Sequence, residues 1–175
     1  TNLKKKIQSL SYTNESNLYY GPLSSPAATK GFLDYQAKLM QLGAKPILKA
    51  RKVNNPFNLV TPSLMNITGM SKAYDEENFG PILQVQFVDT FEEAIEAANN
   101  TKYGLAAGLI SDNKNLFNEF VDRINAGVIN FNSTTTGASG AFPFGGIGRS
   151  GNLRPAGYYA ADYCAWPKAS IIKQL

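Results

Sequence analysis

The chain has 175 residues, of which 43% are hydrophobic and 17% are charged, and its formal net charge is +4. This composition is typical of a globular protein and argues against a disordered one. With no histidine and a single cysteine, Cys164, the chain cannot hold histidine-dependent catalysis, an internal disulfide or a cysteine-cluster zinc site.

Helical and strand-like segments alternate in the first half of the chain. Residues 1–12 have apolar side chains at helical spacing but no N-terminal cap, so they are interpreted as the end of a helix whose beginning is missing. Ser25 and the proline after it predict the start of a second helix, which Gly43 ends. In the last strand-like segment, Val85 and Phe87 alternate with glutamines, which predicts one buried face. The strand-like segments are 47–48, 57–60, 63–67 and 82–88.

The second half of the chain repeats this alternation. Thr90 and Glu93 form a capping box, which predicts a helix that ends near residue 99. A further helix is expected to begin after a cap at Ser111 or Asp112. The predicted elements here are a buried strand at 105–110, a helix at 114–124 and a strand at 128–131. The whole pattern predicts an α/β fold, with a mostly parallel sheet and helical crossovers.

A long segment rich in serine, threonine, glycine and alanine occupies residues 133–151. Loops of this length are usually functional or disordered. Residues 134–140 have little side-chain cover, so their backbone N–H groups could form a nest for a carboxylate, and the alternative is a flexible linker. Residues 146–151 spell G-x-G-x-x-G, but Pro155 blocks the helix that a dinucleotide fingerprint needs. These glycines are therefore interpreted as allowing tight turns or close backbone approach.

Two other features could carry chemistry, and each has a structural alternative. Cys164 has apolar neighbours and no histidine to activate it, so we expect a buried, inert thiol rather than a nucleophile. The segment Glu76–Pro81 combines carboxylates with an aromatic ring before Gly-Pro. It could present a carboxylate to ribose hydroxyls and a ring to a flat heterocycle, or it could be an acidic surface turn.

Several motifs, in order and spacing, resemble the C-terminal part of the NAD(P)-dependent aldehyde dehydrogenase superfamily. They are Glu76–Pro81, Ala98–Leu105, Pro143–Gly146 and Ser150–Gly151. Other segments are similar to the branch of the family that oxidises a succinylated glutamate semialdehyde in bacterial arginine breakdown. These segments are 130–132, 136–138, 151–155 and 158–167.

The resemblance implies a thiol mechanism and an incomplete active site. In this family a cysteine attacks the aldehyde, hydride passes to NAD, and water activated by a glutamate hydrolyses the thioester. The nucleophile, the base and most of the NAD site lie N-terminal to the region that matches, and Cys164 does not match the nucleophile. We therefore expect an oxidoreductase fragment with no catalytic residue and no metal site, inactive alone.

Five residues acquire roles from the resemblance. Glu77 matches a glutamate that binds the nicotinamide ribose, and Phe79 matches an aromatic residue that packs beside the nicotinamide. Gly137 and Ala138 match a loop whose backbone N–H groups hold the α-carboxylate of the substrate. Phe144 matches an aromatic residue near the aldehyde pocket.

The resemblance also implies an organisation and a set of partners. Residues 1–132 would form a partial catalytic domain, residues 133–157 a substrate-anchor loop with a glycine-rich turn, and residues 158–175 a tail whose strand pairs with another subunit. We expect a cytoplasmic homo-oligomer that binds a small-molecule semialdehyde and NAD, but neither nucleic acid nor a membrane.

Alternatives remain open for both the substrate and the class of protein. Phe131, Ser133, Thr134 and Arg149 depart from the pattern of related enzymes, and Arg149 could either contact a carboxylate or face solvent. The alternatives are an aldehyde dehydrogenase of the glutamate semialdehyde or pyrroline-5-carboxylate type, and a non-catalytic assembly module. A nucleic-acid binder is suggested only by the net charge.

Overall fold

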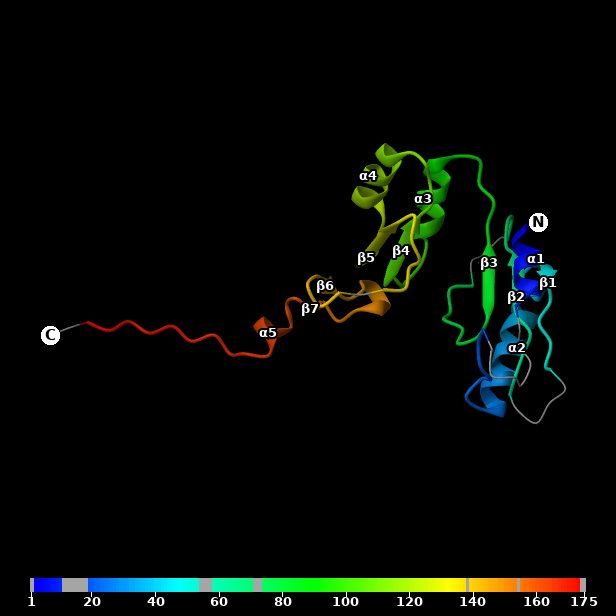
Figure 1. Ribbon diagram of the computed structural model, residues 1–175, viewed down its shortest axis with the longest axis horizontal. Helices are drawn as coiled ribbons and strands as arrows, with labels where there is room; N and C mark the ends of the chain where they lie inside the picture. The colour runs from blue at the N-terminus through cyan, green and yellow to red at the C-terminus, as the bar shows by residue number, and fades with distance from the viewer. Residues whose placement is uncertain are drawn as a thin grey trace. The chain divides into compact units, whose positions relative to one another are not determined.

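Two compact units, Thr1–Asp89 and Thr90–Leu175, make up the chain in a computed structural model (Figure 1). The structure describes residues 2–10, 19–53, 58–70, 74–137, 139–153 and 155–173. In these residues, no helix has the length and apolar character that a membrane crossing requires. Each unit has its own packed core, and each is described separately below.

A three-stranded sheet with one long helix packed against it forms the first unit. β2 is the central strand, and it pairs antiparallel with β1 and parallel with β3. The helix α2 contributes Tyr35 and Leu39 to a core that Met65 of β2 completes. The elements are α1 (Asn2–Gln8), α2 (Pro26–Gln41), β1 (Lys45–Leu48), β2 (Ser63–Asn66) and β3 (Ile82–Val85).

The ends of α2 follow the predicted signals. The Ser25 side chain accepts a hydrogen bond from the Ala28 N–H at 3.1 Å, and proline occupies the first turn. Gly43 follows the last turn with φ +103°, a conformation that glycine adopts without steric cost. Both predicted boundaries are confirmed.

The buried face expected for β3 is wrong. Phe87 lies beyond the strand and is 60% exposed, whereas Gln84 is only partly exposed. The cause is a polar contact beneath α2, because the Gln84 amide donates a hydrogen bond to the Tyr35 hydroxyl at 3.1 Å. Of the segment predicted at 57–60, Phe57 lies outside the described residues, and Val60 forms an isolated bridge with Lys52.

The second unit contains a parallel strand pair with a helical crossover. β4 pairs in parallel with β5, and α4 connects them. Ile95 of α3 packs with Phe120 of α4 and with Ile124 over one face of this pair. The elements are α3 (Phe91–Asn99), β4 (Ala106–Leu109), α4 (Lys114–Arg123), β5 (Val128–Phe131), β6 (Pro143–Phe144), η1 (Gly148–Ser150), β7 (Ala156–Gly157) and α5 (Ala160–Tyr163).

The predicted α/β class is confirmed, and so are parallel strand pairs, β2–β3 and β4–β5, of which the second is joined by the helix α4. Two antiparallel pairs, β1–β2 and β6–β7, accompany the parallel pairs. The strand predicted as buried at 105–110 is only partly covered, and Ile110 is 85% exposed. The reason is that the helices of this unit pack over a single face of the β4–β5 pair.

The capping box of α3 is confirmed, and the cap of α4 is displaced by one residue. The Thr90 hydroxyl accepts the Glu93 N–H at 3.1 Å. At α4 the cap is Asn113, whose side chain accepts the Asn115 N–H at 2.9 Å. Ser111 instead accepts the Asn113 N–H at 3.0 Å, which fixes the turn before the helix.

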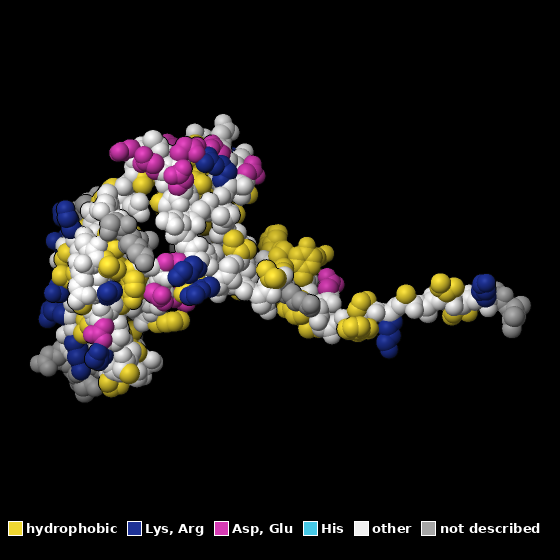
Figure 2. Space-filling view, turned by 180° about the vertical axis from the view of Figure 1, so that it is seen from behind, with side chains coloured by type: hydrophobic (Ala, Val, Ile, Leu, Met, Phe, Trp, Pro, Cys, Tyr) yellow, Lys and Arg dark blue, Asp and Glu magenta, His cyan; other side chains and the backbone are white. Residues whose placement is uncertain are grey.

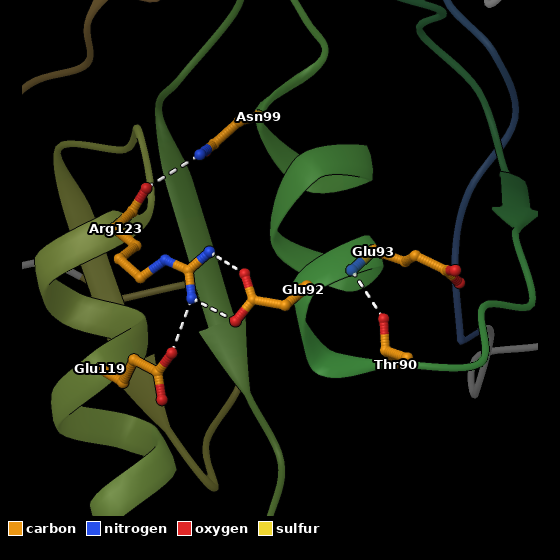
Figure 3. Close-up of polar contacts among 6 residues, drawn as sticks. All are labelled: Thr90, Glu92, Glu93, Asn99, Glu119 and Arg123. Carbon is orange, nitrogen blue, oxygen red and sulfur yellow. Dashed lines mark hydrogen bonds and ion pairs between the residues drawn. The ribbon is translucent and has the colours of Figure 1, made fainter.

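Arg123 links the two helices of the second unit (Figure 3). Its guanidinium donates to Glu119 at 2.6 Å within α4 and to Glu92 of α3 at 2.8 Å, and a second nitrogen contacts Glu92 as well. The neighbouring Asn99 donates to the Arg123 carbonyl at 2.8 Å. The hydrogen bond from Arg123 lowers the pKa of Glu92 and raises that of Arg123.

We expect the ion pair between Arg123 and Glu92 to contribute slightly to the stability of the fold and to lose this contribution in acid. A carboxylate whose pKa is depressed in the folded state contributes stability above its unfolded pKa, and the contribution disappears as the pH falls through the folded pKa. We expect Glu92→Gln to lower the melting temperature at about pH 6 and to have a smaller effect at about pH 3. Glu96→Gln, at an exposed position of the same helix, is the control. Equal effects of the two variants at both pH values would contradict this account.

The C-terminal tail contains the short helix α5. The prediction that Cys164, which follows this helix, is buried is wrong. The thiol is exposed rather than buried, because α5 and the residues after it pack little against the rest of this unit. Among the described residues, 164–173 pair with no strand. Figure 2 shows hydrophobic side chains gathered around β6, β7 and α5. The exposed ones include Phe142, Leu153, Tyr158, Tyr159, Tyr163 and Trp166.

Candidate functional site

The first unit has an open pocket of about 880 Å³, lined by α2 and by the segment that precedes β3. Both residues predicted to bind cofactor, Glu77 and Phe79, line it. Phe79 is 79% exposed, and Glu77 is exposed as well. The structure therefore places a carboxylate and an aromatic ring on the wall of one pocket.

A buried tyrosine holds the segment that carries these two residues. The Tyr35 hydroxyl donates to the Glu76 carbonyl at 3.1 Å and accepts from the Gln84 amide, and its ring lies 5.1 Å from that of Tyr74. Burial raises the pKa of Tyr35, so the hydroxyl remains protonated and able to donate. Sequence reasoning missed this role of Tyr35, because the contact spans 41 residues.

Gly80 sets the path of the chain after Phe79. A Cβ atom at Gly80 would lie 2.4 Å from the buried ring of Phe32, so the backbone approaches that ring more closely than a side chain allows. Beyond this point the Pro81 carbonyl accepts the Ser63 N–H at 2.8 Å, which joins the segment to the sheet. Glu77 and Phe79 thus lie between two fixed points, the Tyr35 contact and the Gly80 turn.

This arrangement fits part of a nucleotide cofactor. A carboxylate can accept hydrogen bonds from ribose hydroxyls, and an exposed aromatic face can lie against a flat heterocycle. The Asn78 Oδ1 between them is buried and has no hydrogen-bond partner in the described chain. The pocket is open rather than a closed cavity. These residues could contact one end of a dinucleotide.

The second unit has a pocket of about 530 Å³ beneath the serine- and threonine-rich loop, and we call it the loop pocket. Gly137 and Phe144, two of the predicted substrate residues, line it. Ala138, the third, lies outside the described residues. The pocket is also lined by residues of β5, so it joins the end of the parallel strand pair to the loop.

Asn132 fixes the start of this loop. Its φ is +50°, a left-handed conformation that asparagine tolerates better than most residues. Its side chain accepts the Ser111 N–H at 2.9 Å and donates to the Ser111 carbonyl at 2.8 Å. Sequence reasoning did not assign this role to Asn132, although asparagine at the end of a strand is a signal for such a turn.

The loop itself is exposed, and hydrogen bonds between residues close in the sequence hold it. The Thr134 hydroxyl donates to the Thr136 carbonyl at 3.2 Å, and the Thr136 hydroxyl donates to that of Thr134 at 3.0 Å. Gly137 has φ +139°, which favours glycine at this position. The absence of a side chain there leaves the backbone uncovered, which suits the binding of an anionic group.

The glycine-rich motif at 146–151 forms a packed turn rather than a dinucleotide site. A Cβ atom at Gly151 would lie 1.8 Å from the Gly146 carbonyl oxygen, and one at Gly148 would lie 2.3 Å from that of Lys102. Close backbone approach, the interpretation favoured from the sequence, is confirmed. The exposed side chain of Arg149 lines a separate pocket of about 510 Å³, which shares Phe144 with the loop pocket.

Metal ligands do not gather in the part of the chain that the structure describes. No three side chains among its cysteine, aspartate and glutamate residues are grouped as a metal ion would require.

Comparison with known proteins defines the class of this chain. A sequence profile of the aldehyde dehydrogenase family matches residues 1–169, so the chain belongs to the aldehyde dehydrogenase family. The resemblance inferred from the motifs is thereby confirmed.

Two curated relatives of this chain carry the same enzyme name. The chain is 48% identical over 153 residues to the N-succinylglutamate 5-semialdehyde dehydrogenase of Vibrio cholerae, a match that covers 87% of this chain and 31% of that protein. It is 43% identical over 166 residues to the enzyme of the same name from Burkholderia ambifaria, covering 95% of this chain and 34% of that protein. The chain therefore spans about a third of the length of the curated relatives it matches.

Solved structures show the same fold. An aldehyde dehydrogenase from Bacillus cereus in complex with NAD+ is 30% identical, with a TM-score of 0.81, over 92% of this chain and 33% of that one. A succinic semialdehyde dehydrogenase from Streptococcus pyogenes in complex with NADP+ is 29% identical, with a TM-score of 0.79, over 87% of this chain and 34% of that one.

Proposed function

We propose that this chain acts as the C-terminal part of an enzyme that oxidises N-succinylglutamate 5-semialdehyde to N-succinylglutamate with NAD, in the succinyl-transferase route of arginine breakdown. The observation that carries the proposal is the identity of 43–48% to enzymes of that name over 87–95% of the chain. We call the longer protein the parent enzyme. NAD accepts the hydride of the aldehyde in this reaction.

The first unit supplies the cofactor contacts. Glu77 accepts hydrogen bonds from the nicotinamide ribose, and Phe79 packs beside the nicotinamide ring. Support comes from their shared pocket and from the Tyr35 contact that fixes the backbone at Glu76. The phosphate groups of NAD bind the part of the parent enzyme that precedes this chain, because one carboxylate and one ring offer no anion site.

The second unit supplies the substrate contacts. Backbone N–H groups at Gly137 and Ala138 hold the α-carboxylate, and Phe144 packs against the aldehyde chain. Support comes from the loop pocket, which Gly137 and Phe144 line together. A parent enzyme that acts on free glutamate semialdehyde is the second candidate, because Phe131 and Arg149 depart from the pattern of related enzymes and leave the substrate assignment open.

The chain divides into three segments, of which the last serves assembly. Residues 1–132 form part of the catalytic domain, residues 133–157 form the substrate loop and its glycine-rich turn, and residues 158–175 pair with another subunit of a cytoplasmic homo-oligomer. The exposed apolar side chains around α5 support this role for the tail (Figure 2). The chain alone is inactive, because no residue of it matches the nucleophile or the base.

The cofactor role of Glu77 is tested by Glu77→Gln in the parent enzyme, with N-succinylglutamate 5-semialdehyde as substrate. We expect kcat/KM for NAD to fall about 10- to 100-fold, because a charged acceptor is lost from the ribose. Glu76→Gln is the matched control, since Glu76 lines the same pocket but supplies its backbone carbonyl to Tyr35. Equal effects of the two variants, or no effect of Glu77→Gln, would contradict the assignment.

A further inference from the structure

Asn130 carries a buried hydrogen-bond donor that the described chain leaves without an acceptor. The residue lies in β5, and its side-chain nitrogen Nδ2 is shielded from solvent and has no partner among the described residues. A buried donor without an acceptor destabilises the fold, so such groups are rare in native proteins. The donor therefore indicates an acceptor that arrives from elsewhere.

The alternation of β5 places this donor on the side of the loop pocket. Ile129 packs into the core beneath α3 and α4, and the ring of Phe131 stacks on Phe117 of α4. Because neighbouring side chains of a strand point to opposite faces, Asn130 points away from these helices. There it lines the same pocket of about 530 Å³ as Gly137.

The loop covers this face of the strand pair. Gly108 of β4 lies opposite Asn130, and a Cβ atom at Gly108 would lie 3.4 Å from the Thr135 methyl group and 3.7 Å from the Ser133 carbonyl oxygen. A ligand in the pocket is thus enclosed by the strands on one side and by the loop on the other. Asn130 belongs to the strand wall, and Gly137 belongs to the loop wall.

We propose that Asn130 Nδ2 donates a hydrogen bond to the amide carbonyl of an N-acyl group on the substrate, and so selects N-acylated over free-amine semialdehydes. This inference rests on the proposed function. A neutral amide donor suits a neutral carbonyl oxygen, whereas the backbone at Gly137 suits the carboxylate. A free amine would place its own N–H groups against the Asn130 donor, which leaves that donor unsatisfied.

The selectivity is tested with Asn130→Asp in the parent enzyme, which keeps the side-chain shape and removes both donors. We expect kcat/KM for N-succinylglutamate 5-semialdehyde to fall about 5- to 150-fold, mainly through KM. The value for propanal, which has neither an acyl group nor a carboxylate, stays within about 2-fold. Equal losses on the two aldehydes would overturn the inference, because they indicate a general defect.

Asn130→Leu separates a ligand contact from a structural role and adds no charge near the carboxylate. In the parent enzyme it gives the same selective loss. In the 175-residue chain without ligand, the melting temperature is unchanged or raised, because the unpartnered donor is gone. A decrease of more than about 4 °C would overturn the inference, because it would mean that the amide stabilises the fold.

Different results would contradict the proposed function and the role of Asn130. A wild-type parent enzyme without activity on the succinylated aldehyde contradicts both. A wild-type enzyme that prefers this substrate, together with Asn130→Asp and Asn130→Leu variants that retain the preference, overturns the inference alone.

Discussion

Replacement of Gly127 by alanine is expected to destabilise the second unit by about 3 kcal/mol. A Cβ atom at this position would lie 1.6 Å from the Gly145 carbonyl oxygen and 3.2 Å from the Gly146 Cα. Both neighbours are backbone atoms, so rotation of a side chain cannot relieve the overlap. The segment after Phe144, which leads into the glycine-rich turn at 146–151, must therefore move.

Gly140→Ala is the matched control for this prediction. Gly140 lies in the loop of the same unit, and a Cβ atom there meets nothing within 4 Å. Urea unfolding of the 175-residue chain, followed by circular dichroism, measures both variants. Comparable stabilities for Gly127→Ala and Gly140→Ala would show that the two backbone segments do not cross as closely as the structure indicates.

Gln36→Leu is expected to destabilise the first unit by about 2–5 kcal/mol. Gln36 is 2% exposed, and its amide makes paired hydrogen bonds with the Ala50 backbone, donating at 3.2 Å and accepting at 2.7 Å. It also accepts from the Ser63 hydroxyl at 2.8 Å. Leucine fills the space but leaves the Ala50 N–H and C=O buried without partners, and each such group costs about 1–3 kcal/mol.

Gln41→Leu provides the comparison, because Gln41 ends the same helix at an exposed position. We expect its effect on unfolding to be within about 0.5 kcal/mol of zero. If Gln36→Leu proved equally mild, the polar contacts between α2 and the segment at Ala50 would contribute little to the fold.

Local signals predicted the helices well, because caps act over a few residues. Ser25 and Thr90 form the hydrogen bonds expected of them. The cap of α4 moved to Asn113 because three polar residues in succession, 111–113, could each begin a helix, and sequence alone does not rank them.

Long-range contacts could not be predicted in the same way. Gln36 lies within a helical pattern that gives no sign of the partner at Ala50. The buried face assigned to β3 failed because Gln84 has a partner on α2, and the thiol of Cys164 is exposed because the tail is not packed. These outcomes depend on which surfaces meet, and a single sequence does not specify that.

Sequence motifs predicted the residues of the candidate site, but they did not predict its geometry. The sequence grouped Glu77 with Phe79 and Gly137 with Phe144, and each pair lines one pocket. The contacts that fix these groups, at Tyr35 and at Asn132, and the unpartnered amide of Asn130 appear only in the folded chain.

We propose that this chain belongs to an enzyme selective for a succinylated semialdehyde. Formation of NADH by the parent enzyme, measured side by side with N-succinylglutamate 5-semialdehyde and free glutamate semialdehyde, tests it most directly. We expect kcat/KM to be at least about tenfold higher for the succinylated aldehyde, because a site built to hydrogen-bond a substrate group rejects the analogue that lacks it. Equal values, or a preference for the free aldehyde, would contradict the claim.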